Sequence, residues 1–205
     1  MQIVFLSDTH NQHSALANLP AADMIIHAGD ISMAGSAAEV MDFIDWFDSL
    51  DYQYKLFIAG NHDYCLDGKA RERLQKFLPS NMHYLYNSGV EIEHIKFWGI
   101  PFLISCELRI ANYRSALENI PRDTDVLITH RPPFGILDKS ANIQYGCPDL
   151  LQTVQRICPR YHLFGHVHDA CGIYKPQNGA TFINGAILNE NYQLANEPVR
   201  FELCD

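Results

Sequence analysis

Residues 55–63, KLFIAGNHD, guide the interpretation of the whole chain. The first five form a short, mostly apolar run that is typical of a buried β-strand. The run ends at Gly60, and Asn61, His62 and Asp63 follow at once. Sites in open α/β sheets form beyond the carboxyl ends of strands, so these side chains are candidates for a site at a sheet edge. A simple polar loop is the alternative.

An apolar run followed by metal-capable side chains recurs at four other places in the chain. Three of these places are weak evidence alone, because Asp-x-His, Gly-Asp and single histidines also occur in turns, helix caps and cores. The stretch 165–168, GHVH, is better evidence, because residues two apart in an extended chain face the same side and both imidazoles can point at one site. Together they favour one site, since each lies at the end of an expected strand. Residues 3–7 precede Asp8 and His10, residues 24–28 precede Asp30, residues 125–129 precede His130, and residues 161–164 precede His166 and His168.

Segments with helical spacing alternate with these strands, and the alternation predicts an α/β sandwich of mixed sheets with helices outside. The expected helices cover residues 36–50, 69–78, 111–120 and 149–157. Shorter strand-like runs predict a hairpin or meander, then a second hairpin and a last strand. They cover residues 84–86, 90–92, 96–98, 172–174, 180–183 and 199–203.

Length and composition place the chain among ordinary globular proteins. It has 205 residues, of which 47% are hydrophobic and 19% charged, and we expect residues 1–205 to form a single domain. With 15 Lys and Arg against 24 Asp and Glu, the net charge is −9. An acidic surface repels phosphate backbones, which argues against a general nucleic-acid binder but not against a small phosphorylated substrate.

We expect a cytoplasmic protein with free thiols. The N-terminus has neither a basic region nor a small-residue cleavage site, so it does not look like a signal peptide. No apolar run approaches the length of a membrane span. The 6 cysteines are scattered and form no CxxC pair, which is typical of thiols in a reducing compartment.

The ligand types at the strand ends favour transition metals. Imidazole combined with carboxylate suits Zn, Fe, Mn or Ni better than Ca or Mg. Two such ions about 3.5–4 Å apart need a bridging ligand, which a carboxylate can supply. Glycine at 29, 60 and 165 would let the backbone turn sharply and approach closely beside these ligands.

These motifs resemble those of the calcineurin-like metallophosphoesterase superfamily. Its Asp-x-His, Gly-Asp, Gly-Asn-His-Asp/Glu, lone His and Gly-His-x-His motifs all occur here, in order, from Asp8 to His168. The resemblance implies an α/β/β/α sandwich of two mixed β-sheets flanked by helices. Within the superfamily, residues 129–138, THRPPFGILD, resemble the small metallophosphoesterase-domain-containing phosphodiesterases, which include the animal brain-type members.

The resemblance also implies a role for each motif residue. His62 would face the leaving-group oxygen or the phosphoryl oxygens, as an acid or charge stabiliser, and Asp63 would orient its imidazole. The cofactors would be two divalent ions (Mn, Fe, Zn or Ni), with Mn favoured. The implied ligands are Asp8, His10 and His168 for one metal and Asn61, His130 and His166 for the other, with Asp30 bridging the two.

The implied reaction is phosphoester hydrolysis, in which a metal-bound hydroxide attacks phosphorus. The narrower resemblance favours small phosphodiesters, including cyclic nucleotides. A phosphomonoesterase and a catalytically weak, partner-binding scaffold are the alternatives. The net charge and the lack of a basic patch disfavour a nuclease acting on long nucleic acid.

Arg131 follows the expected ligand His130, where many relatives of this branch carry a small residue. A guanidinium fork there would bind a phosphate through two hydrogen bonds. The alternative is a surface arginine paired with one of the many carboxylates. We expect the rim of the pocket to come from residues 102–116 and 134–147.

Overall fold

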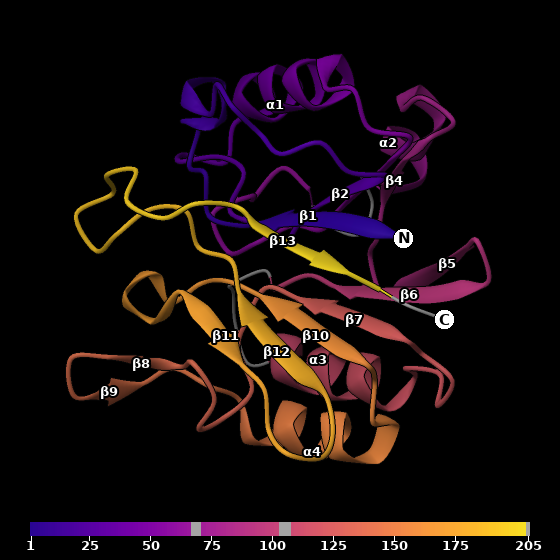
Figure 1. The fold of residues 1–205 in the computed structure, drawn as a ribbon, viewed down its shortest axis with the longest axis vertical. Helices are drawn as coiled ribbons and strands as arrows, with labels where there is room; N and C mark the ends of the chain where they lie inside the picture. Colours follow the sequence, from indigo (N-terminus) through magenta and orange to yellow (C-terminus); the bar gives the residue numbers. More distant parts are fainter. Residues whose placement is uncertain (67–70, 103–107, 204–205) are drawn as a thin grey trace.

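The computed structural model describes residues 1–66, 71–102 and 108–203. Two β-sheets pack face to face, and helices cover the outer face of each (Figure 1). This arrangement confirms the α/β/β/α sandwich of two mixed sheets predicted from the sequence. No helix in the described residues is long and apolar enough to cross a bilayer.

The first sheet has the strand order β13-β1-β2-β3-β4. Strands β1 to β4 run parallel, and β13 pairs antiparallel with β1 at one edge. Helices α1, Ala37–Ser49, and α2, Arg71–Phe77, lie on its outer side (Figure 1). The strands are β1 Gln2–Leu6, β2 Met24–His27, β3 Tyr54–Phe57, β4 Met82–Tyr84 and β13 Val199–Glu202.

The second sheet has the order β11-β12-β10-β7-β6-β5. Its four inner strands run parallel, and β5 and β11 pair antiparallel at the two edges. Helices α3, Leu108–Glu118, and α4, Pro148–Ile157, cover it, and a separate hairpin joins β8, Lys139–Ser140, to β9, Ile143–Gln144. The strands are β5 Ser88–Ile92, β6 Ile95–Ile100, β7 Val126–Thr129, β10 Tyr161–Phe164, β11 Gly172–Tyr174 and β12 Thr181–Asn184.

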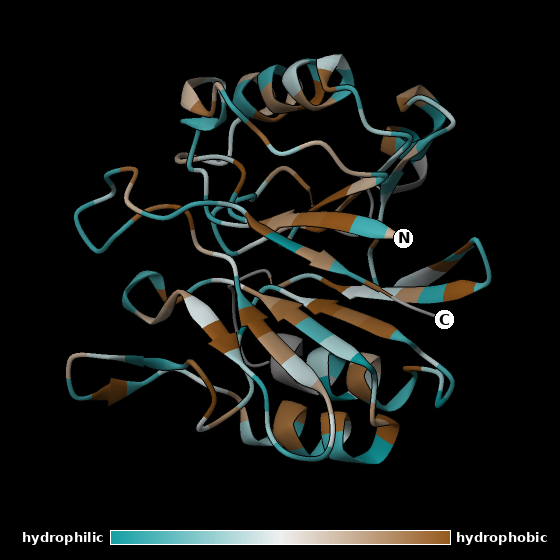
Figure 2. Cartoon of the chain, viewed as in Figure 1, coloured by the Kyte–Doolittle hydropathy of each residue, from teal (hydrophilic) through white to brown (hydrophobic). Residues whose placement is uncertain are grey.

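Alternation along the strands fills two apolar layers. On β1, Ile3 and Phe5 point between the sheets, whereas Val4 and Leu6 pack with Phe43 of α1. Because both faces of the strand are covered, it is apolar throughout, as the run of brown ribbon shows (Figure 2). Parallel strands in the two sheets bring their carboxyl ends to the same side of the sandwich (Figure 1).

Several boundaries differ from the sequence expectations. Strand β4 begins and ends two residues before the expected run at 84–86, and the chain then turns at Asn87, whose φ is 48°, before it enters the second sheet at β5. The β8–β9 hairpin was not predicted. Parts of the expected helix at 69–78 and of the expected rim at 102–116 lie outside the described residues.

Two buried histidines occupy equivalent places in the two sheets. His27 on β2 lies 3.0 Å through Nε2 from the Thr9 hydroxyl, and His162 on β10 lies 2.9 Å from the Thr129 hydroxyl. Each threonine directly precedes an expected metal ligand. Burial lowers the pKa of both histidines to about 3, so both are neutral in the folded protein.

The buried His162 makes stability depend on pH. As the pH falls from about 6.5 toward about 3, the unfolded chain binds a proton that folded His162 rejects, so the free energy of unfolding falls. We expect His162→Gln to reduce this slope near pH 5 by about 1.4 kcal/mol per pH unit. Urea unfolding of the metal-stripped protein from pH 4 to 7 measures the slope.

The matched control is His94→Gln, because the His94 side chain is fully exposed between β5 and β6. Its slope should equal that of the wild type. An unchanged slope in His162→Gln would contradict the prediction.

Candidate metal centre

Sharp backbone turns after the strands aim the candidate ligands inward. Asp8, His10, Asp30 and His166 have φ values of 57°, 40°, 54° and 71°. This left-handed region is uncommon for residues other than glycine, and such outliers cluster at functional sites. The turns return side chains from several strand ends toward one point between the sheets.

Two glycines allow the backbone to pass directly beside the carboxylates, as expected. A Cβ added at Gly165 would collide with Asp8 Oδ2 and the Ser7 hydroxyl, and one at Gly60 would collide with Asp30 Oδ1. Both carboxylates therefore lie in cradles that only glycine leaves open.

Asp8, His10 and His168 form the first donor group. Their candidate ligand atoms all lie within 4.8 Å of one another, with His168 Nε2 3.5 Å from Asp8 Oδ1. The Nδ1 atoms of the two rings face backbone carbonyls, at 3.2 Å from Ser32 for His10 and 2.9 Å from Asn189 for His168. These bonds turn both Nε2 atoms toward the carboxylates, as the outer hydrogen bonds of metal-binding histidines do.

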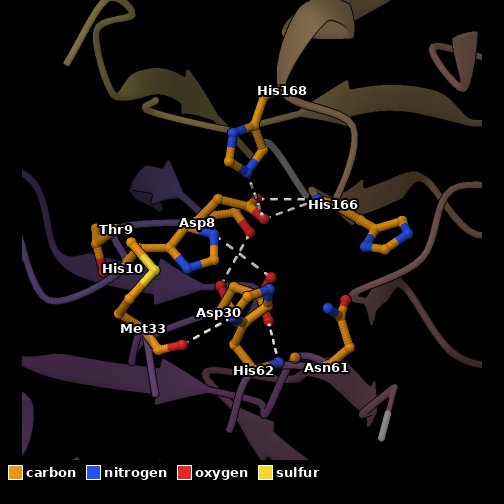
Figure 3. A network of polar contacts seen from close by, with 12 residues as sticks. Asp8, Thr9, His10, Asp30, Met33, Asn61, His62, His166 and His168 are labelled. Atoms are coloured by element: carbon orange, nitrogen blue, oxygen red, sulfur yellow. Dashed lines mark hydrogen bonds and ion pairs between the residues drawn. The ribbon is translucent and has the colours of Figure 1, made fainter. Parts of the chain in front are cut away.

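Asp30, His130 and His166 form the second donor group, again within 4.8 Å of one another. His130 Nε2 lies 3.4 Å from Asp30 Oδ2 and 3.0 Å from Asn61 Oδ1, while its Nδ1 faces the Ala28 carbonyl at 2.8 Å. Asp30 Oδ2 is also 3.5 Å from His10 Nε2, so this carboxylate lies between the two groups. Figure 3 shows His10 and His166 on opposite sides of Asp8 and Asp30.

The electrostatics of the site suit cations. Burial alone would raise the pKa of Asp8, but its hydrogen bond with His168 and the neighbouring histidines hold it well below its usual range. Burial would lower the pKa of His130, but the carboxylates of Asp30 and Asp8 raise it to about 9. Two buried carboxylates thus retain their charge among imidazoles, the condition in which a metal ion can replace protons.

His10 provides a direct test of whether the residues fit a metal. Its Nε2 is buried and has no hydrogen-bond partner among the described residues, and burial lowers the pKa of the ring. A neutral imidazole nitrogen that faces a carboxylate without a proton to share is suited to bind a metal ion. The donor set therefore fits a pair of divalent ions around Asp30.

Asp63 differs from the sequence expectation. Its wholly buried carboxylate accepts hydrogen bonds from the Gly60, Ile31 and Ser32 amides at 2.8, 3.2 and 2.9 Å. The His62 ring instead faces the Met33 carbonyl through Nδ1, at 2.9 Å. Among the described residues, no hydrogen bond joins Asp63 to the His62 ring, so this carboxylate acts on the ring through the backbone of the loop that carries both. These hydrogen bonds from three amides hold the carboxylate in place. They also join the loop after β2 to the loop after β3.

Arg131 lies on the His166 side of the centre. Its Nε donates to the Tyr145 carbonyl at 2.8 Å, and its Cζ lies 5.4 Å from the centre of the Phe102 ring. The Phe102 and His166 ring centres are 5.7 Å apart. Arg131 makes no ion pair with the described residues, so the alternative of a carboxylate-paired surface arginine gains no support.

Tyr192 adjoins the first donor group, although it belongs to none of the five sequence motifs. Its ring centre lies 5.0 Å from that of His10 and 5.2 Å from that of His168. It belongs to the connection between β12 and β13, far from both histidines in sequence. A sequence pattern offers no signal for such a contact.

Comparison with known proteins agrees with this geometry. Residues 1–170 match the family model described as calcineurin-like phosphoesterase. The UPF0046 protein K07C11.7 of Caenorhabditis elegans is 36% identical, covering 98% of this chain and 74% of its own length. The human metallophosphoesterase domain-containing protein 1 is 33% identical, covering 98% of this chain and 71% of its own length.

A solved crystal structure supports the fold independently. It superposes with a TM-score of 0.65 and covers 89% of this chain and 89% of its own. The two sequences are 12% identical, so the likeness concerns the arrangement of sheets and helices alone.

Asp30→Ala tests the shared carboxylate. Because Asp30 lies between the donor groups, we expect its removal to abolish binding of both ions rather than one. Elemental analysis after Mn²⁺ loading and gel filtration should find two Mn per wild-type chain and none in the variant. Asp125→Asn, at the opposite end of β7, should keep both ions. Two ions bound to Asp30→Ala would contradict a bridging role.

Proposed function

The chain belongs to the calcineurin-like phosphoesterase family, and on that basis we propose that it hydrolyses small phosphodiesters with two divalent transition-metal ions. The observation that carries the proposal is the convergence of two His/Asp donor groups on Asp30. A scaffold that only binds partners would have no need for such a complete donor set.

The residues divide into two metal positions. Asp8, His10 and His168 would hold one ion, and Asn61, His130 and His166 the other, with Asp30 shared. Bound there, the ions would lower the pKa of a water and neutralise charge on the phosphoryl oxygens. The chain's own contribution is to fix these ligands, through backbone carbonyls, before substrate arrives.

His62 is placed to serve the leaving group. Its amide donates to Asp30 Oδ1 at 2.8 Å, which holds it beside the centre, and the Met33 carbonyl fixes its ring through Nδ1. The other ring nitrogen, Nε2, is therefore directed away from that carbonyl, and in the doubly protonated ring it carries the proton that would be donated to an oxygen that gains charge. The ring is half-buried, so a substrate can reach it.

The rim favours diesters over monoesters. Met33, Tyr145 and Tyr192 are exposed by 40%, 38% and 41%, and Phe102, like Tyr145, lies beside His166. Arg131 adds one cation. Apolar and aromatic side chains around a single guanidinium suit a diester, which has one negative charge and two organic substituents, better than a doubly charged monoester.

Turnover by the metal-stripped protein with Mn²⁺ added back tests the proposal. We expect metal-dependent hydrolysis of bis-p-nitrophenyl phosphate, faster than that of p-nitrophenyl phosphate. Faster monoester hydrolysis would favour a phosphomonoesterase. Failure to hydrolyse either ester with two ions bound would favour a partner-binding scaffold.

His62→Ala separates catalysis from metal binding. A nitrogen of His62 lies within 4.8 Å of ligand atoms of both His10 and Asp30, so the ring could instead bind metal. If it is an acid or charge stabiliser, kcat for the diester should fall by about 10²–10⁴-fold with both ions retained. Loss of an ion would make His62 a ligand, and full activity would remove it from the mechanism.

Arg131→Ala tests the substrate contact. Loss of a charge-assisted contact to the phosphoryl group should raise KM about 10- to 100-fold and change kcat little. Arg131→Lys, which keeps the charge without the fork, should recover only part of the loss. Arg114→Ala is the control, because Arg114 pairs with Asp149 on the outer helices. Unchanged KM in Arg131→Ala would refute the contact.

A further inference from the structure

Tyr192 presents an aromatic face beside the proposed metal centre. Its ring meets His10 at an interplanar angle of 67° and His168 at 70°. It is nevertheless 41% exposed, so the contact with the two imidazoles leaves part of the ring open to solvent. A side chain that served only to pack the two ligands would not need this open surface.

One residue fixes both Tyr192 and a metal ligand. The Asn189 carbonyl faces His168 Nδ1 and also accepts from the Tyr192 amide, each at 2.9 Å. The Asn189 side-chain oxygen accepts from the amides of Asn191 and Gln193 at 2.9 and 3.0 Å. The turn that carries Tyr192 is thus built directly on the ligand that it adjoins.

The backbone at Tyr192 is held in an unfavourable conformation. Its φ is 56°, the left-handed region that a bulky residue rarely adopts. Gln12, from the loop after β1, donates through Nε2 to the Tyr192 carbonyl at 2.9 Å. Contacts from two distant segments therefore maintain a strained residue, and strain of this kind is concentrated at functional sites.

Tyr192 lies on the same side of the metal centre as His62, the residue proposed to serve the leaving group. The His10 ring has His62 4.7 Å away and Tyr192 5.0 Å away, both edge to face. Across the carboxylates, His166 has Phe102 and Tyr145 at 5.7 and 6.2 Å (Figure 3 shows His10 and His166 on opposite sides). Each side of the centre therefore has its own aromatic wall.

We propose that Tyr192 is a specificity-determining residue whose ring receives the leaving group of the diester and selects flat, aromatic leaving groups over small alkyl ones. The proposal rests on the phosphodiesterase function and on the role of His62 given above. An aromatic leaving group would gain ring contacts with Tyr192 beyond simple burial, whereas a small alkyl group would make few contacts with it.

Two diesters that share a methyl substituent test this, methyl phenyl phosphate and methyl 2,2,2-trifluoroethyl phosphate, assayed with the Mn²⁺-loaded enzyme. Tyr192→Ala should lower kcat/KM for the phenyl ester about fivefold to tenfold, mainly through KM, and less than about twofold for the trifluoroethyl ester. Dividing variant by wild type for each ester cancels their different intrinsic reactivities. Phosphorus NMR follows both reactions.

Two further variants control for a structural role. Tyr192→Phe keeps the ring and should retain wild-type selectivity, and both Tyr192 variants should bind two Mn²⁺. Tyr174→Ala removes an exposed tyrosine on β11 that packs on Phe182, and it should leave kcat/KM unchanged for both esters.

An equal loss of kcat/KM for both esters in Tyr192→Ala, or loss of a metal ion, would overturn the proposal. Tyr192 would then be a structural support for the ligands His10 and His168. No change for either ester would also overturn it. If the wild-type enzyme hydrolysed neither diester, the proposed function itself would fail and this inference with it. Activity without selectivity would refute the role of Tyr192 alone.

Discussion

The burial of two carboxylates, Asp8 and Asp30, is the constraint on which the rest of the structure depends. Their residues are 0% and 2% exposed. A buried carboxylate is costly unless hydrogen bonds and opposite charge compensate it. The Asp8 carboxylate accepts a hydrogen bond from the His166 amide, and the Asp30 carboxylate accepts one from the His62 amide. Imidazole rings surround both carboxylates. The glycine cradles, the left-handed turns and the convergence of strand ends all serve this compensation.

The bonds that compensate the carboxylates also join the two sheets. His130 follows β7 of the second sheet and faces the Ala28 carbonyl after β2 of the first. The His166 amide, after β10, reaches Asp8, after β1. The site is therefore part of what holds the sandwich together, and its ligands cannot shift independently of the sheets. Such rigidity preorganises the donors before any ion or substrate arrives.

The sequence predicts the sheets and the meeting of the motif residues because both follow from local patterns. Strand runs and the side chains just after them are adjacent in the chain, and parallel strands bring their ends to one edge. The partner of Asp63 and the place of Tyr192 depend on contacts between distant loops, such as Gln12 with Tyr192. The left-handed φ of His166 accompanies another such contact, the hydrogen bond from its amide to Asp8. Local periodicity contains no information about these contacts.

This division bears on how proteins of one fold come to differ in substrate. The buried donors are fixed by the sheets, so a change there would disturb charge compensation and metal binding together. Exposed residues such as Tyr145 and Tyr192, 38% and 41% exposed, lie outside the strands of the two large sheets. Neither side chain belongs to the apolar clusters between the layers or donates to the buried carboxylates, so the side chain can vary without removing a buried donor. Substrate selection in this chain should therefore lie in its rim, while the reaction type lies in its donors.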